Sequence, residues 1–263
     1  MSILQAIVLG VVQGITEFLP ISSSGHLIAI PHIFGWAEQG MDFDVMIHLA
    51  TLLAILLVLR KDVLSAVRGV FLPKEKNTVG MKIIIATIPV VIAGVVIESS
   101  FLDTIRTVQV VAVQLIVWGV ILAVADRYGA KKATRTSDVI QTSSKQAILM
   151  GLFQVMALVP GSSRSGVTIG AGLFAGMDRK TAARFSFLLA IPAIAGAGLL
   201  TLIDAFEHGF TTPVVPMVIG FVAAFVSGSL AITFLLQLLE KTNYYWFAGY
   251  RILLGVLLLV FLR

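Results

Sequence analysis

AIVLGVVQGITEFLPISSSG (residues 6–25) and AILMGLFQVMALVPGSSRSG (residues 147–166) are two stretches of one chain that align without a gap at an offset of 141 residues. In each, an apolar segment runs into a cluster of proline, glycine and serine that interrupts a helix. The positions that match are Ala6, Ile7, Gly10, Gln13, Ser22, Ser24 and Gly25 with Ala147, Ile148, Gly151, Gln154, Ser163, Ser165 and Gly166. The sequence therefore predicts an internal repeat, each copy of which opens with a broken apolar segment.

The composition is that of an integral membrane protein. Of 263 residues, 58% are hydrophobic and 13% are charged, and the mean hydropathy is +0.99. A soluble domain is about 45–50% apolar with about 25% charged residues. The chain has no cysteine, which excludes a disulfide framework and a thiolate metal site. Residues 1–19 lack the basic start of a secretory signal peptide, so we interpret them as part of the folded protein.

Six apolar runs are long enough to cross a bilayer, at about 20 residues each. They are Phe43–Leu59, Ile83–Ile97, Val108–Ala125, Ala182–Ile203, Val214–Leu239 and Phe247–Leu262. Two further apolar regions, Met1–Trp36 and Gln146–Gly176, are broken near the middle by PISSSG (20–25) and PGSSRSG (160–166). Because each half of a broken region is too short to span alone, we predict two re-entrant helix–loop–helix segments.

The charge distribution predicts how these segments cross the membrane. Basic residues gather in the connections that follow the first and third predicted spans, while the loops at 98–107 and 204–213 are acidic. The positive-inside rule places the basic connections in the cytoplasm and the acidic loops outside. Six spans satisfy both assignments only if each broken segment returns to the side from which it entered. The net charge of +5 is then topogenic and requires no nucleic-acid partner.

With the loops assigned in this way, the first broken segment enters the membrane from outside and the second enters from the cytoplasm. Each is followed by three spans, so the chain divides into halves of opposite orientation, at about 1–126 and 146–263. We therefore predict an all-α polytopic membrane protein with a single domain, 1–263. Its six transmembrane helices and two re-entrant segments form an inverted-topology repeat, in which the two loop tips meet near the middle of the membrane.

The first broken segment carries a carboxylate at membrane depth. Glu17 follows Gln13 by four residues, so both side chains share one helix face. A carboxylate at this depth costs at least about 2.5 kcal/mol and indicates a functional residue; the alternative is a side chain that reaches water at an interface. Two oxygen ligands at this spacing suit Mg²⁺ or Ca²⁺, completed by water and a substrate phosphate.

Serines, a histidine and an arginine occupy the breaks. Ser22, Ser23 and Ser24 precede His26, which is a candidate acid or base beside a serine nucleophile. Alternatively, the hydroxyls only satisfy backbone groups at a helix break. Arg164 stands in the second break, where its planar fork matches phosphate oxygens, or where it forms an ion pair with Glu17. Further hydroxyl donors in this region are Ser162, Ser163, Ser165 and Thr168.

Together these groups favour phosphoryl transfer on an amphiphile with a phosphate head, since that chemistry depends on positioning and charge neutralisation. The alternative is a transporter or lipid flippase, because inverted repeats with broken helices are typical of transporters. The serine, histidine, glutamate and arginine favour an enzyme, because transport requires no nucleophile.

Both breaks resemble the signatures of the BacA/UppP-type undecaprenyl-diphosphate phosphatases. QGITEFLPISSSGH (13–26) is similar to the family's Glu/Gln-x-x-x-Glu pair followed by P-x-S-S-x-G-H, and PGSSRSGVT (160–168) to its P-G-x-S-R-S-x-x-T. Every signature position is filled, and the resemblance extends over nearly the whole chain. It implies a hydrolase of the bacterial inner membrane that opens to the periplasm and removes the terminal phosphate of undecaprenyl diphosphate. That activity recycles the lipid carrier of peptidoglycan synthesis and is associated with bacitracin resistance.

The resemblance also implies roles for individual residues. Ser23 would be the nucleophile, with His26 assisting or competing for that role, and Glu17 with Gln13 would bind the Mg²⁺ or Ca²⁺ ion. Arg164 would hold the diphosphate, with substrate-binding hydroxyls from Ser22, Ser24, Ser163, Ser165 and Thr168. Many relatives have glutamate at the position of Gln13, which predicts weaker metal binding here. His48, where relatives often have glutamine, is expected to be a buried structural residue, and the alternative is a second polar group near the site. The implied partners are a polyprenyl diphosphate and membrane lipid, and a homodimer is compatible with the sequence.

Overall fold

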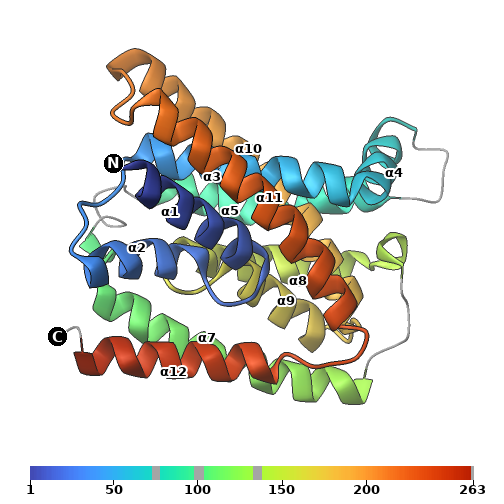
Figure 1. Cartoon of the computed structure of the whole chain (residues 1–263). Coiled ribbons are helices and arrows are strands. Elements are labelled where there is room, and N and C mark those ends of the chain that lie inside the picture. Colours follow the sequence, from blue (N-terminus) through green and yellow to red (C-terminus); the bar gives the residue numbers. More distant parts are fainter. Residues whose placement is uncertain (73–77, 98–103, 133–137, 262–263) are drawn as a thin grey trace.

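The computed structural model describes residues 1–72, 78–97, 104–132 and 138–261, and these residues form helices joined by short connections (Figure 1). In chain order the elements are α1 Ile3–Phe18, α2 Ser23–Phe34, α3 Met41–Val58, α4 Arg60–Phe71, α5 Val79–Val96, α7 Val108–Lys132, η1 Val139–Gln141, α8 Ser144–Gln154, η2 Val155–Leu158, α9 Arg164–Phe174, α10 Arg179–His208, α11 Val214–Leu238 and α12 Tyr245–Phe261.

The predicted spans are confirmed as apolar helices. Within the described ranges, five helices are long and apolar enough to cross a membrane: α3, α5, α7, α10 and α11. The sixth predicted span corresponds to α12, an apolar helix of 17 residues, and its last predicted residue lies outside the described ranges. The chain is therefore an all-α polytopic membrane protein.

One helix was not predicted. The basic connection after the first span contains α4, which Figure 1 shows at one end of the molecule, steeply inclined to α3 and α5. Ala66 on one face of α4 is buried, whereas Leu64 and Phe71 on another are exposed. The helix is amphipathic, but its apolar residues are too few for a span and lie within a charged connection, so hydrophobic length alone does not predict it.

Each broken apolar region consists of two helices on either side of an irregular turn, and the two turns have the same geometry. Ser22 and Ser163 are the only non-glycine residues with positive φ in the described chain, at 76° and 70°. The Oγ atom of each caps the following helix, accepting a hydrogen bond from the amide of Gly25 or Gly166. The 141-residue offset seen in the sequence therefore extends to the backbone conformation.

The starts of the two regions also match. Ser2 and Gln5 form a capping box at the start of α1, and Ser143 and Gln146, at the same offset of 141, form one at the start of α8. In such a box the serine side chain and the glutamine side chain each satisfy a free backbone N–H of the other residue. These two caps fix where each broken region begins.

Helices from the two parts of the chain are interleaved: α1 packs against α11, α8 against α5, α3 against α10, and α7 against α12. Glycines allow the first two of these contacts. A Cβ atom at Gly10 of α1 would lie 2.4 Å from the carbonyl oxygen of Gly220, and one at Gly151 of α8 would lie 2.2 Å from that of Ala86. Both distances are far below contact, so only glycine permits the helices to approach this closely.

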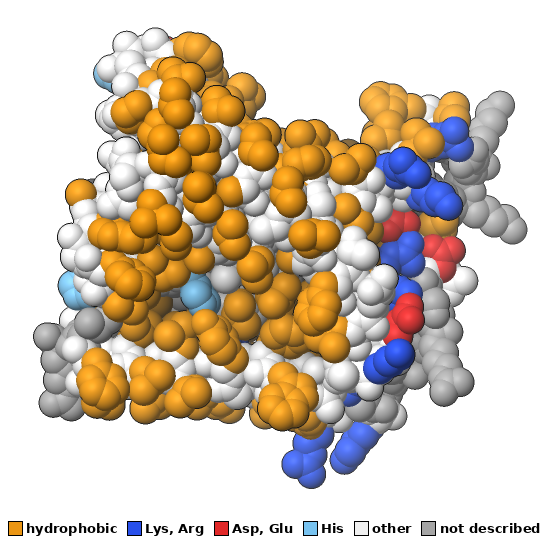
Figure 2. Space-filling model, viewed as in Figure 1, with side chains coloured by type: hydrophobic (Ala, Val, Ile, Leu, Met, Phe, Trp, Pro, Cys, Tyr) orange, Lys and Arg blue, Asp and Glu red, His pale blue; other side chains and the backbone are white. Residues whose placement is uncertain are grey.

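The surface separates by chemistry. Figure 2 shows hydrophobic side chains over the face between the two ends, with lysine and arginine gathered at the end that carries α4. At this end Arg179 pairs with Asp126 and Arg184 pairs with Asp62. The predicted basic connections thus lie together at one end of the helices, as topogenic charges do.

Candidate active site

The two breaks touch. Ser165 Oγ of the second break lies 3.3 Å from the carbonyl oxygen of Leu19, to which it donates, and the amide of Gly161 donates to Ser24 Oγ at 3.3 Å. Residues more than 130 positions apart in sequence therefore form one cluster at the N-termini of α2 and α9.

Glu17 is at the centre of this cluster. Its carboxylate, only 5% exposed, is close to groups from three different helices. Ser23 Oγ donates to Oε2 at 2.7 Å, Gln13 Nε2 donates to the same oxygen at 3.1 Å, and Arg164 NH2 donates to Oε1 at 3.1 Å. The Ser23 hydroxyl thus points at a carboxylate that can accept its proton.

Arg164 is held at several points and keeps one free donor. Its NH1 donates to the carbonyl oxygen of Ser186 on α10 at 3.0 Å, and Thr168 Oγ1 donates to the carbonyl oxygen of Arg164 at 2.8 Å. Thr168 Oγ1 also lies 2.7 Å from Ser186 Oγ. The Nε atom of Arg164 is buried without a hydrogen-bond partner. The ion pair with Glu17 is therefore present, and the guanidinium still has an N–H for an anion.

His26 hydrogen-bonds to groups other than the Ser23 hydroxyl. Its Nδ1 lies 2.7 Å from the carbonyl oxygen of Ser22, and its Nε2 lies 2.7 Å from the hydroxyl of Tyr250 on α12. Because a carbonyl only accepts, we assign the proton to Nδ1, and Nε2 then accepts from Tyr250. Both ring nitrogens have hydrogen-bond partners, so in this arrangement His26 links the first break to α12. The group that accepts the hydrogen bond of the Ser23 hydroxyl is the carboxylate of Glu17, and not the histidine proposed from the sequence.

The other predicted hydroxyls have mainly structural contacts. Ser22 and Ser163 are helix caps, as described above, and their Oγ atoms lie 3.3 Å from those of Ser24 and Ser165. Ser162 Oγ donates to Gln114 Oε1 at 3.1 Å. The sequence-based alternative, that hydroxyls satisfy backbone groups at a helix break, agrees with the contacts of Ser22 and Ser163, whereas Ser23 alone among the serines of the breaks donates to a carboxylate.

The helix N-termini add a positive field to the cluster. Ser23 is the first residue of α2 and Arg164 the first residue of α9, the same position in the two aligned stretches. The first amides of a helix have no partner within it, and their dipoles favour a negative charge. The cluster therefore presents a hydroxyl, a guanidinium and backbone N–H groups to an anion.

A cation would have few protein ligands here. Within the described ranges, no three histidine or acidic side chains group as metal ligands. Gln13, however, is fully buried, and its Oε1 has no hydrogen-bond partner while its Nε2 binds Glu17. An amide oxygen without a donor beside a carboxylate fits a hard cation completed by water and phosphate oxygens.

His48 corrects one expectation. Rather than a buried structural residue, it is 32% exposed, and its Nε2 lies 3.7 Å from Glu17 Oε2. Its Nδ1 lies 2.7 Å from the carbonyl oxygen of Asp44, one turn earlier in α3. The expected burial was wrong, because hydropathy along α3 does not show which helix face the first broken segment meets, whereas the alternative of a polar group near the site agrees with this distance.

Three further residues at the site were not predicted: Ser186, Tyr250 and Arg251, which contact Arg164, His26 and the two breaks respectively. Arg251 had a detectable signal, since it interrupts the apolar run of α12. An arginine inside a membrane segment is expensive and indicates a specific partner. Ser186 and Tyr250 have no such signal, because serine and tyrosine are common in membrane helices.

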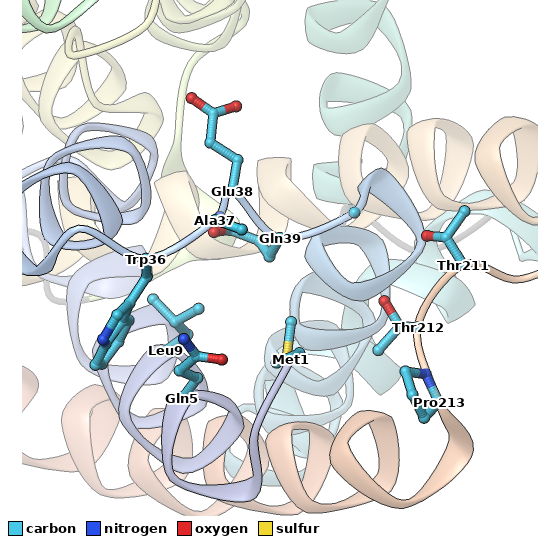
Figure 3. A pocket seen from close by; sticks show the side chains of 11 residues that line it. Met1, Gln5, Leu9, Trp36, Ala37, Glu38, Gln39, Thr211, Thr212 and Pro213 are labelled. Atoms are coloured by element: carbon cyan, nitrogen blue, oxygen red, sulfur yellow. The ribbon is translucent and has the colours of Figure 1, made fainter.

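A separate cavity of about 290 Å³ lies between the start of α1, the connection from α2 to α3, and the connection from α10 to α11. Figure 3 shows Gln5, Trp36, Glu38 and Thr211 among the side chains that surround it. None of the candidate residues of the breaks lines this cavity, so it takes no part in the candidate site.

The fold and the cluster define a class: a polytopic helical membrane protein whose polar residues converge where two broken helices meet. Residues 6–257 match the family described as bacitracin resistance protein BacA, and the chain belongs to this family.

Similar proteins cover almost the whole chain. It is 42% identical to the undecaprenyl-diphosphatase of Trichlorobacter lovleyi, over 97% of this chain and 96% of that protein. The undecaprenyl-diphosphatase of Moorella thermoacetica is 44% identical over 98% and 97%, and that of Chlorobaculum tepidum 39% identical over 99% and 97%.

Proposed function

We propose that this chain is an integral-membrane undecaprenyl-diphosphatase, which hydrolyses undecaprenyl diphosphate to undecaprenyl phosphate and inorganic phosphate. Its substrate is a membrane lipid, and its activity recycles the carrier of peptidoglycan synthesis for cell-wall biogenesis and supports bacitracin resistance. The observation that carries the proposal is the contact of Ser23, Gln13 and Arg164 with the single carboxylate of Glu17. Relatives named for this activity match the chain from end to end.

The geometry supports Ser23 as the nucleophile. Its Oγ attacks the terminal phosphorus while its proton passes to Glu17 Oε2, 2.7 Å away. The bond from phosphorus to the bridging oxygen breaks, and the lipid monophosphate leaves. Water then attacks the phosphoserine, which releases inorganic phosphate and restores the hydroxyl. Arg164 and the N-termini of α2 and α9 stabilise the charge on the transferring phosphoryl group.

Charge balance supports a divalent cation. Arg164 is already paired with Glu17, so the two together bring no net charge to a diphosphate that carries several negative charges. Glu17 and Gln13 would hold Mg²⁺ or Ca²⁺, which neutralises the diphosphate when bound. The buried Oε1 of Gln13 without a partner is the structural feature that fits this ion.

We expect detergent-purified protein to release phosphate from farnesyl or undecaprenyl diphosphate with Mg²⁺ or Ca²⁺ present. Excess EDTA is expected to abolish the release, because Arg164, already paired with Glu17, cannot neutralise the negative charge of the diphosphate by itself. EDTA already saturated with the cation serves as the control and should leave the rate unchanged. Full activity in excess chelator would exclude the metal. Complete inactivity with both cations would contradict the phosphatase and favour the transporter or flippase.

The architecture behind this site is, in our proposal, a single domain of two inverted repeats, 1–126 and 146–263, each opening with a re-entrant segment. The paired serine turns, capping boxes and glycine contacts at an offset of 141 residues support the repeat. In Figures 1 and 2, α1 begins at the end away from the lysines and arginines, and the chain enters α8 from the end where they gather. We propose that the protein lies in the inner membrane with the site open to the periplasm.

Cysteine labelling tests this topology, because the natural chain contains no cysteine. Single cysteines at Ser2 and Glu38 are expected to react with a membrane-impermeant maleimide in intact cells. Those at Lys145 and Lys180 should react only after permeabilisation, since each re-entrant segment returns to its own side. Labelling of Lys145→Cys and Lys180→Cys from opposite sides would show that the second segment crosses the membrane and would end the inverted-repeat proposal.

The proposed partners are the polyprenyl diphosphate and the surrounding bilayer, and no nucleic acid. The basic residues lie together at one end of the helices, where the positive-inside rule accounts for them. A homodimer is compatible with this arrangement, and light scattering of the solubilised protein would reveal its mass.

A further inference from the structure

Arg251 of α12 is a fully buried arginine, 0% exposed, at the junction of the two breaks. No ion pair of the described residues includes it. A buried guanidinium without a carboxylate is costly, so its surroundings must stabilise the charge in another way.

Backbone carbonyls provide that stabilisation. NH1 of Arg251 donates to Pro20 O of the first break at 3.2 Å. NH2 donates to Gly161 O at 3.1 Å and to Ser162 O at 2.9 Å, both in the second break. Nε lies 3.4 Å from Leu115 O on α7. One guanidinium thus joins both breaks to a transmembrane helix, which its rigid fork of five N–H donors makes possible.

The backbone of the second break is shaped to admit this side chain. A Cβ atom at Gly166 would lie 2.5 Å from NH1 of Arg251. At Gly25, the matching position of the first break, the nearest atoms to such a Cβ would be Ser22 Oγ and Val111 Cγ1, both at 3.2 Å. The guanidinium therefore lies directly against the start of α9.

We propose that Arg251 is a positioning residue for the phosphatase reaction: by holding carbonyls of both breaks, it sets the separation of the Ser23 hydroxyl from the Arg164 guanidinium. Pro20 precedes Ser23 by three residues and Ser162 precedes Arg164 by two. Arg251 therefore binds the backbone immediately before each of these two groups. In the described part of the chain Arg251 hydrogen-bonds only to backbone carbonyls and not to the side chains of Ser23, Glu17 or Arg164, so it acts through the backbone. The inference rests on the proposed function, because the two groups it aligns are those of the hydrolysis.

The test is Arg251→Lys, assayed for phosphate release in detergent with Mg²⁺ and compared with the wild type in kcat, KM and Tm. The single ammonium of lysine cannot reach both breaks, so we expect kcat to fall about 100-fold, the effect of a misplacement of about 1 Å. KM should stay within about threefold, because the phosphate-binding groups remain in place. A merely structural arginine would lower Tm and the active fraction without changing kcat per folded molecule.

Arg179→Lys is the matched control, since Arg179 is paired with Asp126 at the basic end of the molecule. It should lower Tm and keep kcat. If Arg251→Lys fails to fold, the same measurements are made on Gly166→Ala, because the added methyl group would displace NH1 of Arg251. Gly170→Ala, one turn further along α9, is its control, since that Cβ would have no neighbour closer than 3.9 Å.

Wild-type kcat in both Arg251→Lys and Gly166→Ala would overturn the positioning role while the phosphatase stands. A loss of activity that only follows the folded fraction would overturn it as well. An inactive wild type would instead overturn the proposed function, and with it the role of Arg251.

Discussion

Replacement of Ser23 with alanine is expected to lower kcat for phosphate release by at least about 10³-fold, with little change in KM. Ser23 alone among the serines of the breaks donates to a carboxylate, so no neighbouring hydroxyl has a proton acceptor that would let it serve as the nucleophile instead. Arg164 and the helix N-termini, which bind the diphosphate in our proposal, remain intact in this variant. Phosphate release by purified protein at saturating lipid substrate measures the effect.

Ser229→Ala is the control for this substitution. Ser229 lies on α11, where its Oγ donates only to Phe225 O of the same helix, so phosphate release should match that of the wild type. Activity that survives Ser23→Ala and His26→Ala separately but falls in Arg164→Ala would contradict the nucleophile assignment and leave the binding role of Arg164 standing. Mass spectrometry of acid-quenched enzyme would detect a phosphate on Ser23 directly.

Substitutions of Glu17 or Arg164 are also expected to have large effects, because they lower both kcat and the stability of the fold. Glu17→Gln should lower kcat about 10³-fold, since it removes the proton acceptor of Ser23. Arg164→Met should lower kcat by at least about 100-fold, because it removes the guanidinium beside the transferring phosphate. Each single change leaves a buried charge unpaired, which costs about 3–5 kcal/mol.

The Tm of the double variant Glu17→Gln/Arg164→Met shows whether the two side chains stabilise the fold as a pair or independently of each other. Because the two groups touch at 3.1 Å, the double variant should have a higher Tm than either single one. Glu240→Gln is the matched control, since its exposed pair with Lys180 should leave Tm unchanged. Strictly additive losses of stability, or a Glu17→Gln enzyme as active as the wild type, would contradict the roles given to this pair.

Much of the site followed from local sequence. Glu17, Ser23 and Arg164 were selected because each is a polar or charged group at a helix break in an apolar chain, where burial without a function is costly. That they meet was predicted from the match of residues 6–25 with 147–166, and the contact of Arg164 with Glu17 agrees with it.

Other features could not be predicted in this way. The partner of His26 lies 224 residues away on α12, and Arg251 of the same helix binds both breaks. His48 was expected to be buried, yet it faces the carboxylate of Glu17. Each of these depends on how a helix is rotated against distant neighbours, and a uniformly apolar helix in lipid has little amphipathic pattern from which to infer that rotation.

The membrane class, the spans, the two breaks and the polar groups they carry could all be predicted from the amino-acid sequence. Hydrophobic length and the cost of burying charge act on each segment separately and can be read locally. Which of those groups interact became visible in the folded chain, where Glu17 rather than His26 accepts from Ser23, and Arg251 donates to both breaks. These pairings depend on close packing between helices that are distant in sequence, where glycines such as Gly10 and Gly151 set the approach.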